Sequence, residues 1–311
     1  MDNFNILLDK YANLCVKVGI NIQKDQPLVI NAPVEGVEFV RLLAKHAYEA
    51  GAKEVYVNWD DGELTRMKFE YAPMEVFENF PKWYADGMED YAEKGAGFIS
   101  ISARDPYLLK GIDPKKIAAS NKSSSIGLKK FREYTMNDIN SWCVISIPTK
   151  KWAIRVFPNV DEDEAVEKLW DAIFKALRIY EEDPVEAWKK HLDNIESKVK
   201  FLNEKSFKKL YYKSSNGTDL EVELPEGHIW AGGGGRNSKG IYFVANMPTE
   251  EVFTMPHKYG VNGVVYSTKP LNYGGNLINN FSLTFKDGKV VDFTANEGYD
   301  VLKDLLSLDE G

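Results

Sequence analysis

Two adjacent glutamates are the residues of this sequence whose type and setting best suit chemistry. Glu250 and Glu251 belong to segment 246–254, which reads Asn-Met-Pro-Thr-Glu-Glu-Val-Phe-Thr, and they lie between a strand-like run and another short apolar run. Carboxylate oxygens suit hard or borderline divalent ions. Adjacent side chains on an extended backbone point to opposite sides, so we expect only one of the two to face a site. A solvated acidic turn is the alternative to a metal ligand.

The four histidines do not form a zinc-binding motif. His46 and His191 fall in predicted helices, and neither has a second histidine four residues along the chain, as a His-Glu-x-x-His motif requires. We interpret both as surface or packing residues. His228 and His257 fall in predicted loops, where each could orient a substrate or serve a structural role.

The cysteines and a Gly-rich segment show no catalytic pattern. Cys15 lies on the apolar face of a predicted helix and Cys143 in an apolar strand-like run, so both are predicted to be small buried hydrophobes. Two cysteines in 311 residues make no disulfide framework. Residues 232–236 read Gly-Gly-Gly-Gly-Arg but lack the Lys-Ser/Thr and the strand-to-helix setting of a phosphate loop. They predict either a flexible loop near a substrate pocket or a plain connection.

The overall charge and hydropathy exclude several classes of protein. The chain has 39 basic and 47 acidic residues and a net charge of -8. A general binder of nucleic-acid backbones needs a basic surface, so nucleic acid is not an expected partner. The mean hydropathy of -0.37 and the lack of a long apolar run argue against a membrane span. The chain starts on an amphipathic pattern rather than a secretory signal, so we expect a cytoplasmic location.

In the first half of the chain, the elements that must position these residues alternate between helix and strand. Apolar residues at three-to-four spacing predict a helix over 4–18. Asp161 and Asp183 are predicted to cap two helices within 161–205. Predicted strands, with helices between them such as one over 37–50, cover residues 27–30, 54–57, 97–101 and 142–147. This alternation predicts an α/β domain with a mostly parallel sheet covered on both faces.

From about residue 206 the pattern changes to antiparallel strands. Asn216-Gly217 and Asp287-Gly288 each separate two strand-like runs, which is typical of a hairpin turn. Two further strands and a final helix are predicted over 241–244, 261–266 and 299–308.

These patterns predict two domains. We expect an α/β domain over 1–205, followed by an α+β domain rich in antiparallel strands over 206–311. The second domain has no closing elements after its last helix, so we expect it to be incomplete at its end.

Several strings of this sequence resemble one family. Segment 246–254, with Pro256-His257-Lys258 after it, is similar to a stretch of the thermophilic metallo-aminopeptidases of the aminopeptidase T and aminopeptidase S type. The likeness continues over Gly235-Arg236-Asn237-Ser238, Val261-Asn262-Gly263, Pro270-Leu271, Gly274-Gly275, residues 285–291 and Asp309-Glu310-Gly311. The N-terminal order of helix, Leu28-Val29-Ile30 strand and Ala50-Gly51-Ala52 also fits, so all 311 residues can be laid against the family.

The resemblance implies a metal-dependent aminopeptidase that releases N-terminal residues from peptides. It further implies two divalent metal ions (cobalt, zinc or magnesium), a homodimer, and a site in a cavity of the C-terminal half. The family's first glutamate ligand falls in the Pro-Thr-Glu-Glu string. The family's spacing to its next glutamate favours Glu251 over Glu250 as the metal ligand, and the resemblance places no catalytic residue in this chain.

The same resemblance places most of the family's metal ligands beyond Gly311. We therefore expect the chain to be C-terminally truncated and its activity to be impaired. The alternative function is a non-catalytic module that binds peptides or a partner. A nucleotide-dependent enzyme that uses the Gly-rich segment rests on fold analogy alone.

Overall fold

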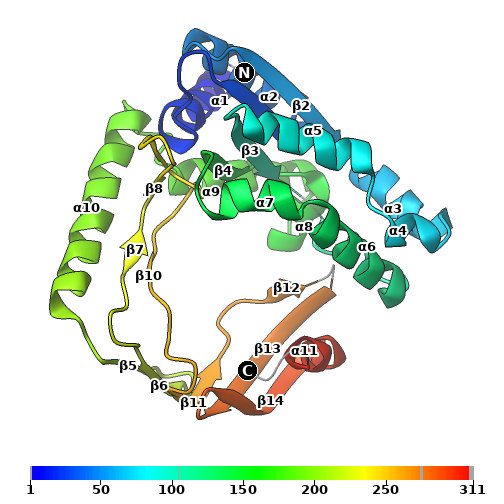
Figure 1. Cartoon of the computed structure of the whole chain (residues 1–311). Helices are drawn as coiled ribbons and strands as arrows, with labels where there is room; N and C mark the ends of the chain where they lie inside the picture. The colour runs from blue at the N-terminus through cyan, green and yellow to red at the C-terminus, as the bar shows by residue number, and fades with distance from the viewer. Residues whose placement is uncertain (1, 104, 274–275, 308–311) are drawn as a thin grey trace. The chain divides into compact units, whose positions relative to one another are not determined.

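The computed structural model describes residues 2–103, 105–273 and 276–307 (Figure 1). The chain forms two compact units, and neither is a single stretch of sequence. The first unit comprises Met1–Asp105, Gly111–Asn194 and Gly233–Glu250, and the second comprises Pro106–Lys110, Ile195–Gly232 and Glu251–Gly311. The predicted domains 1–205 and 206–311 stay a prediction, because a compact unit is not by itself an independently folding domain.

A four-stranded parallel sheet forms the centre of the first unit. Its strands are β1 (Pro27–Pro33), β2 (Glu54–Asp60), β3 (Gly97–Ser102) and β4 (Trp142–Ser146), in the order β2-β1-β3-β4. Each pair is parallel, and Val29 of β1 lies between Tyr56 and Phe98. The four strands predicted from their apolar runs are confirmed, as is the parallel sheet.

The helices of the first unit pack against the two faces of this sheet or against one another. They are α1 (Asp2–Leu14), α2 (Val37–Glu49), α3 (Gly62–Tyr71), α4 (Glu75–Glu78), α5 (Lys82–Glu93), α6 (Pro114–Gly127), α7 (Lys129–Met136), α8 (Lys150–Val156), α9 (Glu162–Ala176) and α10 (Pro184–Lys205), which continues into the second unit. A π-helical turn (η1, Cys15–Gly19) follows α1, and a 3-10 turn (η2, Val34–Gly36) lies between β1 and α2. Leu28 and Ile30 face the core shared with α1, α2, α8 and α9, whereas Val29 faces α5. Successive strand residues point to opposite faces, so a strand covered on both faces needs consecutive apolar residues, as in Leu28-Val29-Ile30.

Helices α9 and α10 start at the residues that the sequence predicted. The side chain of Asp161 accepts a hydrogen bond from the Glu164 backbone N at 2.9 Å and caps α9. Asp183 accepts from Val185 N at 2.9 Å and from Glu186 N at 3.1 Å, which fixes the start of α10. Both caps satisfy helix-terminal N–H groups that have no partner within the helix.

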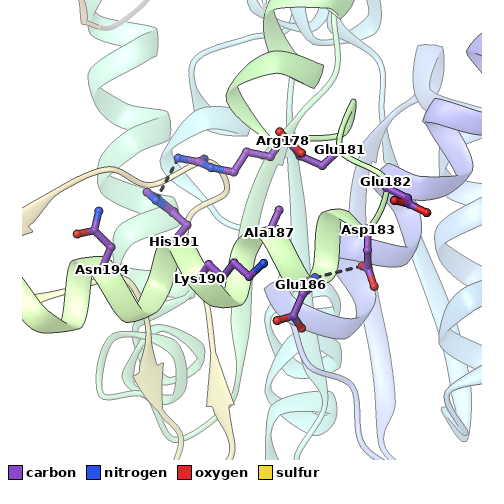
Figure 2. Close-up of a pocket in the computed structure, with 9 residues that line it drawn as sticks. All are labelled: Arg178, Glu181, Glu182, Asp183, Glu186, Ala187, Lys190, His191 and Asn194. Atoms are coloured by element: carbon purple, nitrogen blue, oxygen red, sulfur yellow. Dashed lines mark hydrogen bonds between the residues drawn. The ribbon is translucent and has the colours of Figure 1, made fainter.

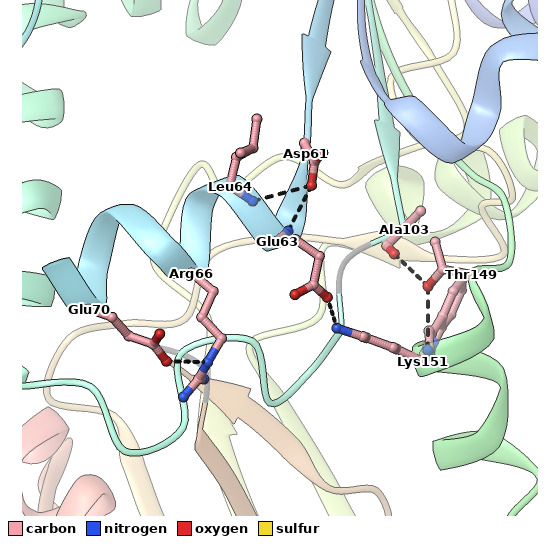
Figure 3. Close-up of polar contacts among 9 residues, drawn as sticks. Asp61, Glu63, Leu64, Arg66, Glu70, Ala103, Thr149 and Lys151 are labelled. Atoms are coloured by element: carbon pink, nitrogen blue, oxygen red, sulfur yellow. Dashed lines mark hydrogen bonds and ion pairs between the residues drawn. The ribbon is translucent and has the colours of Figure 1, made fainter.

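Polar side chains hold the loops that follow three of the parallel strands (Figure 3). Asp61 caps α3 by accepting from Glu63 N at 2.8 Å. Thr149 donates its hydroxyl to the Ala103 carbonyl oxygen at 2.9 Å, and Lys151 forms an ion pair with Glu63. These contacts join the loops after β2, β3 and β4 to one another.

The second unit is built on an antiparallel sheet. Its strands are β5 (Lys209–Lys213), β6 (Asp219–Glu223), β11 (Val261–Tyr266), β12 (Leu271–Tyr273), β13 (Asn276–Lys286) and β14 (Lys289–Glu297), followed by helix α11 (Tyr299–Leu306). The hairpins predicted at Asn216-Gly217 and Asp287-Gly288 are confirmed by the pairs β5–β6 and β13–β14. Asp287 and Gly288 both have positive φ, 50° and 79°, as a tight hairpin turn requires.

Four two-residue strands surround the segment that carries the glutamates. β7 (Ala231–Gly232) pairs with β10 (Val252–Phe253) in the second unit, and β8 (Gly235–Arg236) pairs with β9 (Tyr242–Phe243) in the first. The strand predicted over 241–244 is thus shortened to two residues.

Some sequence predictions fall outside the described residues, namely those on Gly274-Gly275, Leu308 and Asp309-Glu310-Gly311. Among the helices that the structure describes, none combines the length and apolar character needed to cross a membrane.

Candidate functional site

Segment 246–254 starts along the free edge of the parallel sheet. Val144 of the edge strand β4 donates its backbone N–H to the Ala245 carbonyl oxygen at 2.8 Å, and Met247 N donates back to the Val144 carbonyl oxygen at 2.9 Å. Met247 is buried in the core of the first unit. Main-chain pairing therefore fixes the chain just before Pro248, and the two glutamates follow within three residues.

The Glu250 carboxylate is already engaged by the first unit. Arg178, in the turn between α9 and α10, donates from Nη2 to Glu250 Oε1 at 3.0 Å. The Glu250 Oε2 atom lies 3.5 Å from His191 Nε2. The pairing with the guanidinium uses one carboxylate oxygen of Glu250 and orients the side chain toward Arg178.

His191 of α10 links the same arginine to the backbone of the segment. Its Nε2 donates to the Thr249 carbonyl oxygen at 2.8 Å, and its Nδ1 lies 3.0 Å from Arg178 Nη2. A carbonyl oxygen only accepts, so Nε2 carries the hydrogen and Nδ1 is left to accept from Arg178. His191 is buried, with its ring edge-on to Trp188 at 5.3 Å. The packing role predicted for it includes hydrogen bonds that no local pattern indicated.

A hollow of about 560 Å³ opens beside this arginine and histidine (Figure 2). Figure 2 shows Arg178 and His191 pointing toward one another at one side of it. The hollow is lined by Arg178, Glu181, Glu182, Asp183, Glu186, Ala187, Lys190, His191 and Asn194. Its acidic rim includes the cap of α10, so the start of that helix explains part of the negative charge there.

Glu251 has a different environment from its neighbour. Its side chain is exposed, and among the described residues no hydrogen bond or ion pair reaches its carboxylate. Its main chain leads directly into β10, where Val252 pairs with Gly232. A Cβ atom on Gly232 would lie only 2.6 Å from the Glu251 carbonyl oxygen. The first glycine of the Gly-rich segment is therefore needed for this close approach of two main chains.

The two predicted metal ligands differ in their surroundings, and the choice between them stays a prediction. It offers an exposed carboxylate that no cation of the described chain neutralises, whereas Glu250 is paired with Arg178. In the part of the chain that the structure describes, no three His, Cys, Asp or Glu side chains are grouped to hold a metal ion. Glu251 thus fits as one ligand, and the described residues do not supply a complete set.

The remaining histidines lie in other surroundings. The Nε2 atom of His46 lies 3.0 Å from Asp9 Oδ1, and its Nδ1 atom lies 3.0 Å from Glu49 Oε2. The Nδ1 atom of His228 bonds the Pro225 carbonyl oxygen at 2.9 Å, and its Nε2 is buried without a partner among the described residues. His257 is exposed.

Both cysteines are buried and free, as predicted. Burial raises the pKa of the Cys15 thiol and of the Cys143 thiol well above the usual range. A catalytic thiol needs a lowered pKa and access to solvent, so neither residue suits nucleophilic catalysis.

Known proteins resemble this chain over its whole length. The profile of the thermophilic metalloprotease family (M29) matches residues 4–311. The chain is 51% identical over 311 residues to aminopeptidase AmpS of Bacillus subtilis (strain 168), which covers 100% of this chain and 76% of that protein. It is also 51% identical to aminopeptidase 2 of Geobacillus stearothermophilus, covering 100% of this chain and 75% of the relative.

A solved structure gives the same result for the fold. Wild-type AmpT from Thermus thermophilus superposes with a TM-score of 0.93 at 39% identity, covering 99% of this chain and 76% of that one. The parallel and antiparallel sheets described above are therefore shared with that protein. The match of sequence and of fold over nearly all residues shows that this chain belongs to the thermophilic metalloprotease family (M29).

Proposed function

We propose that this enzyme is a metal-dependent aminopeptidase that releases N-terminal residues from peptides. The observation that carries the proposal is the 51% identity, over the whole chain, to two proteins named aminopeptidases. Membership of a metalloprotease family supports a divalent metal cofactor. Neither the relatives nor the described residues favour the alternative of a non-catalytic binding module.

We further propose that Glu251 is a metal ligand and that Glu250 is not. The unpaired carboxylate of Glu251 and the Arg178 partner of Glu250 support this choice. A divalent ion supplies Lewis acidity toward the carbonyl of the peptide bond to be cut. We also propose that the enzyme binds two divalent ions per chain, and that these are cobalt, zinc or magnesium.

The experiment that tests this function is hydrolysis of an aminoacyl chromogenic substrate by the full chain. We expect weak release of the chromophore with cobalt or zinc, because the described residues supply only part of a ligand set. A chelator should abolish this release, and restoring the metal should recover it. The matched variants are Glu251→Ala, which should lose metal-dependent release, and Glu250→Ala, which should reduce release less, because it removes a contact of the site with Arg178 but no metal ligand. Release that is insensitive to chelator, or no release with any of the three metals, would contradict the proposal.

The quaternary state and location of the enzyme are proposals as well. The resemblance to aminopeptidases T and S supports a homodimer, and the amphipathic start of the sequence supports a cytoplasmic location. Light scattering coupled to size-exclusion chromatography should give twice the chain mass of 35.3 kDa. A monomer at micromolar concentration would contradict the dimer, and recovery of the enzyme outside the cytoplasmic fraction would contradict the location.

A further inference from the structure

We propose that Arg178 and His191 are positioning residues for Glu251. They hold the two residues that precede Glu251, one by its main chain and the other by its carboxylate. This inference rests on the proposed role of Glu251 as a metal ligand, and it adds residues that the family comparison does not assign.

The first anchor is the bond between His191 and Thr249. The donor atom belongs to a buried side chain on the long helix α10, and the acceptor is a main-chain carbonyl two residues before Glu251. Consecutive Cα atoms are about 3.8 Å apart, so a carbonyl held at this point limits where the next residues can lie. Loss of the donor would leave that carbonyl without its partner.

The second anchor is the pair of Arg178 and Glu250. The two hydrogens of Arg178 Nη2 are directed to two acceptors, Glu250 Oε1 and His191 Nδ1, each at 3.0 Å. The guanidinium thus joins the histidine and the glutamate in one network. Since 64% of the Glu250 side chain is exposed, this ion pair contributes little to stability, and its effect is on position.

The arginine is itself held in place. Its Nη1 donates to the Ala176 carbonyl oxygen at 3.1 Å, and its guanidinium lies 5.6 Å from the centre of the Trp188 ring. Trp188 is fully buried and donates from Nε1 to the Leu177 carbonyl oxygen at 2.7 Å. Arg178 therefore presents a fixed donor pair rather than a free surface charge.

Glu251 depends on these anchors because its own side chain has none. A ligand must be held within about 0.5 Å of its productive position, and supporting contacts usually supply that precision. Groups that orient a metal ligand without touching the ion typically change metal affinity about 10- to 100-fold when they are replaced. The network of Arg178 and His191 is placed to do this through the main chain.

The test measures zinc affinity of the full chain by calorimetry, together with amide hydrogen exchange over residues 246–254. His191→Asn keeps an acceptor near Arg178 but loses the donor to Thr249, whereas His191→Gln can keep that donor. We expect His191→Asn to weaken zinc binding about tenfold and to speed exchange. His191→Gln should stay within about threefold of the unchanged protein, because it keeps the donor on which the anchor depends.

Arg178→Gly tests the second anchor independently. Arg178 has a φ of 59°, which glycine adopts without strain, so this change removes the guanidinium while preserving the turn. We expect weaker zinc binding and faster exchange in segment 246–254. His46→Asn, a histidine replacement in α2, is the matched control and should change neither quantity.

The outcomes separate this inference from the proposed function. If Glu251→Ala leaves zinc affinity unchanged, or the unchanged protein binds no zinc, the ligand role fails and the inference fails with it. If Glu251→Ala abolishes binding while His191→Asn and Arg178→Gly do not weaken it, the positioning inference alone is wrong. Failure of His191→Gln to restore affinity would also contradict it, since a purely structural defect predicts no such rescue.

Discussion

His191 donates a hydrogen bond of 2.8 Å to the main-chain carbonyl of Thr249, across 58 residues of sequence. The bond joins helix α10 to the segment that carries both glutamates. It leaves the Nδ1 atom of His191 as the acceptor for Arg178, which in turn pairs with Glu250. The arginine that contacts this ring engages Glu250, whereas no described residue pairs with the Glu251 carboxylate.

The packing beneath this ring depends on Trp188. We expect Trp188→Phe to destabilise the protein by about 1–3 kcal/mol, because the Leu177 carbonyl loses its buried donor. Trp188→Ala should cost about 3–5 kcal/mol, since a cavity is added. Urea unfolding followed by circular dichroism measures both values. Equal midpoints for Trp188→Phe and the unchanged protein would show that the indole N–H contributes nothing.

The start of α10 depends on the Asp183 cap. Asp183→Ala should lower the free energy of unfolding by about 1 kcal/mol, because two N–H groups at the first turn lose their acceptor. Asp183→Asn retains a capping oxygen and is the matched control. Thermal unfolding should rank the unchanged protein and Asp183→Asn together, above Asp183→Ala, and the reverse order would argue against the cap.

The hairpin turn between β13 and β14 requires glycine for two reasons. Gly288 has a φ of 79°, and a Cβ atom there would overlap the Lys258 carbonyl oxygen. Gly227 has a φ of 75° but no atom within 4 Å of such a Cβ, so it isolates the backbone effect. We expect Gly227→Ala to cost about 1–2 kcal/mol and Gly288→Ala more than about 3 kcal/mol. Similar costs by urea unfolding would mean that the turn shifts to relieve the overlap.

Stability should fall in mildly alkaline solution because of the two buried thiols. Burial raises the pKa of both Cys15 and Cys143 in the folded protein, whereas thiols in the unfolded chain titrate near pH 8.5. Above about pH 8.5 the unfolded state has therefore lost protons that the folded state keeps, so the free energy of unfolding decreases as pH rises. Each thiol contributes a slope of about 1.4 kcal/mol per pH unit once its unfolded form is ionised.

The measurement is urea unfolding between pH 7.5 and about pH 9, where Tyr and Lys side chains of the unfolded chain are still mostly protonated. Cys143→Ala should reduce the slope relative to the unchanged protein, although it lowers the stability at neutral pH. An unaltered slope in Cys143→Ala would show that this thiol does not titrate on unfolding.

The sequence by itself determined most of the secondary structure and the fold class. Alternating apolar strands and amphipathic helices predicted the parallel sheet, and Asp161 and Asp183 marked the helix starts where the structure has them. Asn216-Gly217 and Asp287-Gly288 predicted both hairpins. These features depend on neighbours within a few residues, so local spacing and turn chemistry are sufficient to predict them.

Only the tertiary structure decided how the site segment is held. The sequence predicted antiparallel strands after residue 206, yet residues 233–250 belong to the compact unit of the parallel sheet, and residues 245–247 pair with β4. The two glutamates look alike in sequence, and what distinguishes them is Arg178, which lies 72 residues before Glu250. Hydrogen bonds and ion pairs between residues far apart in sequence leave no local pattern, because each depends on how the whole unit packs.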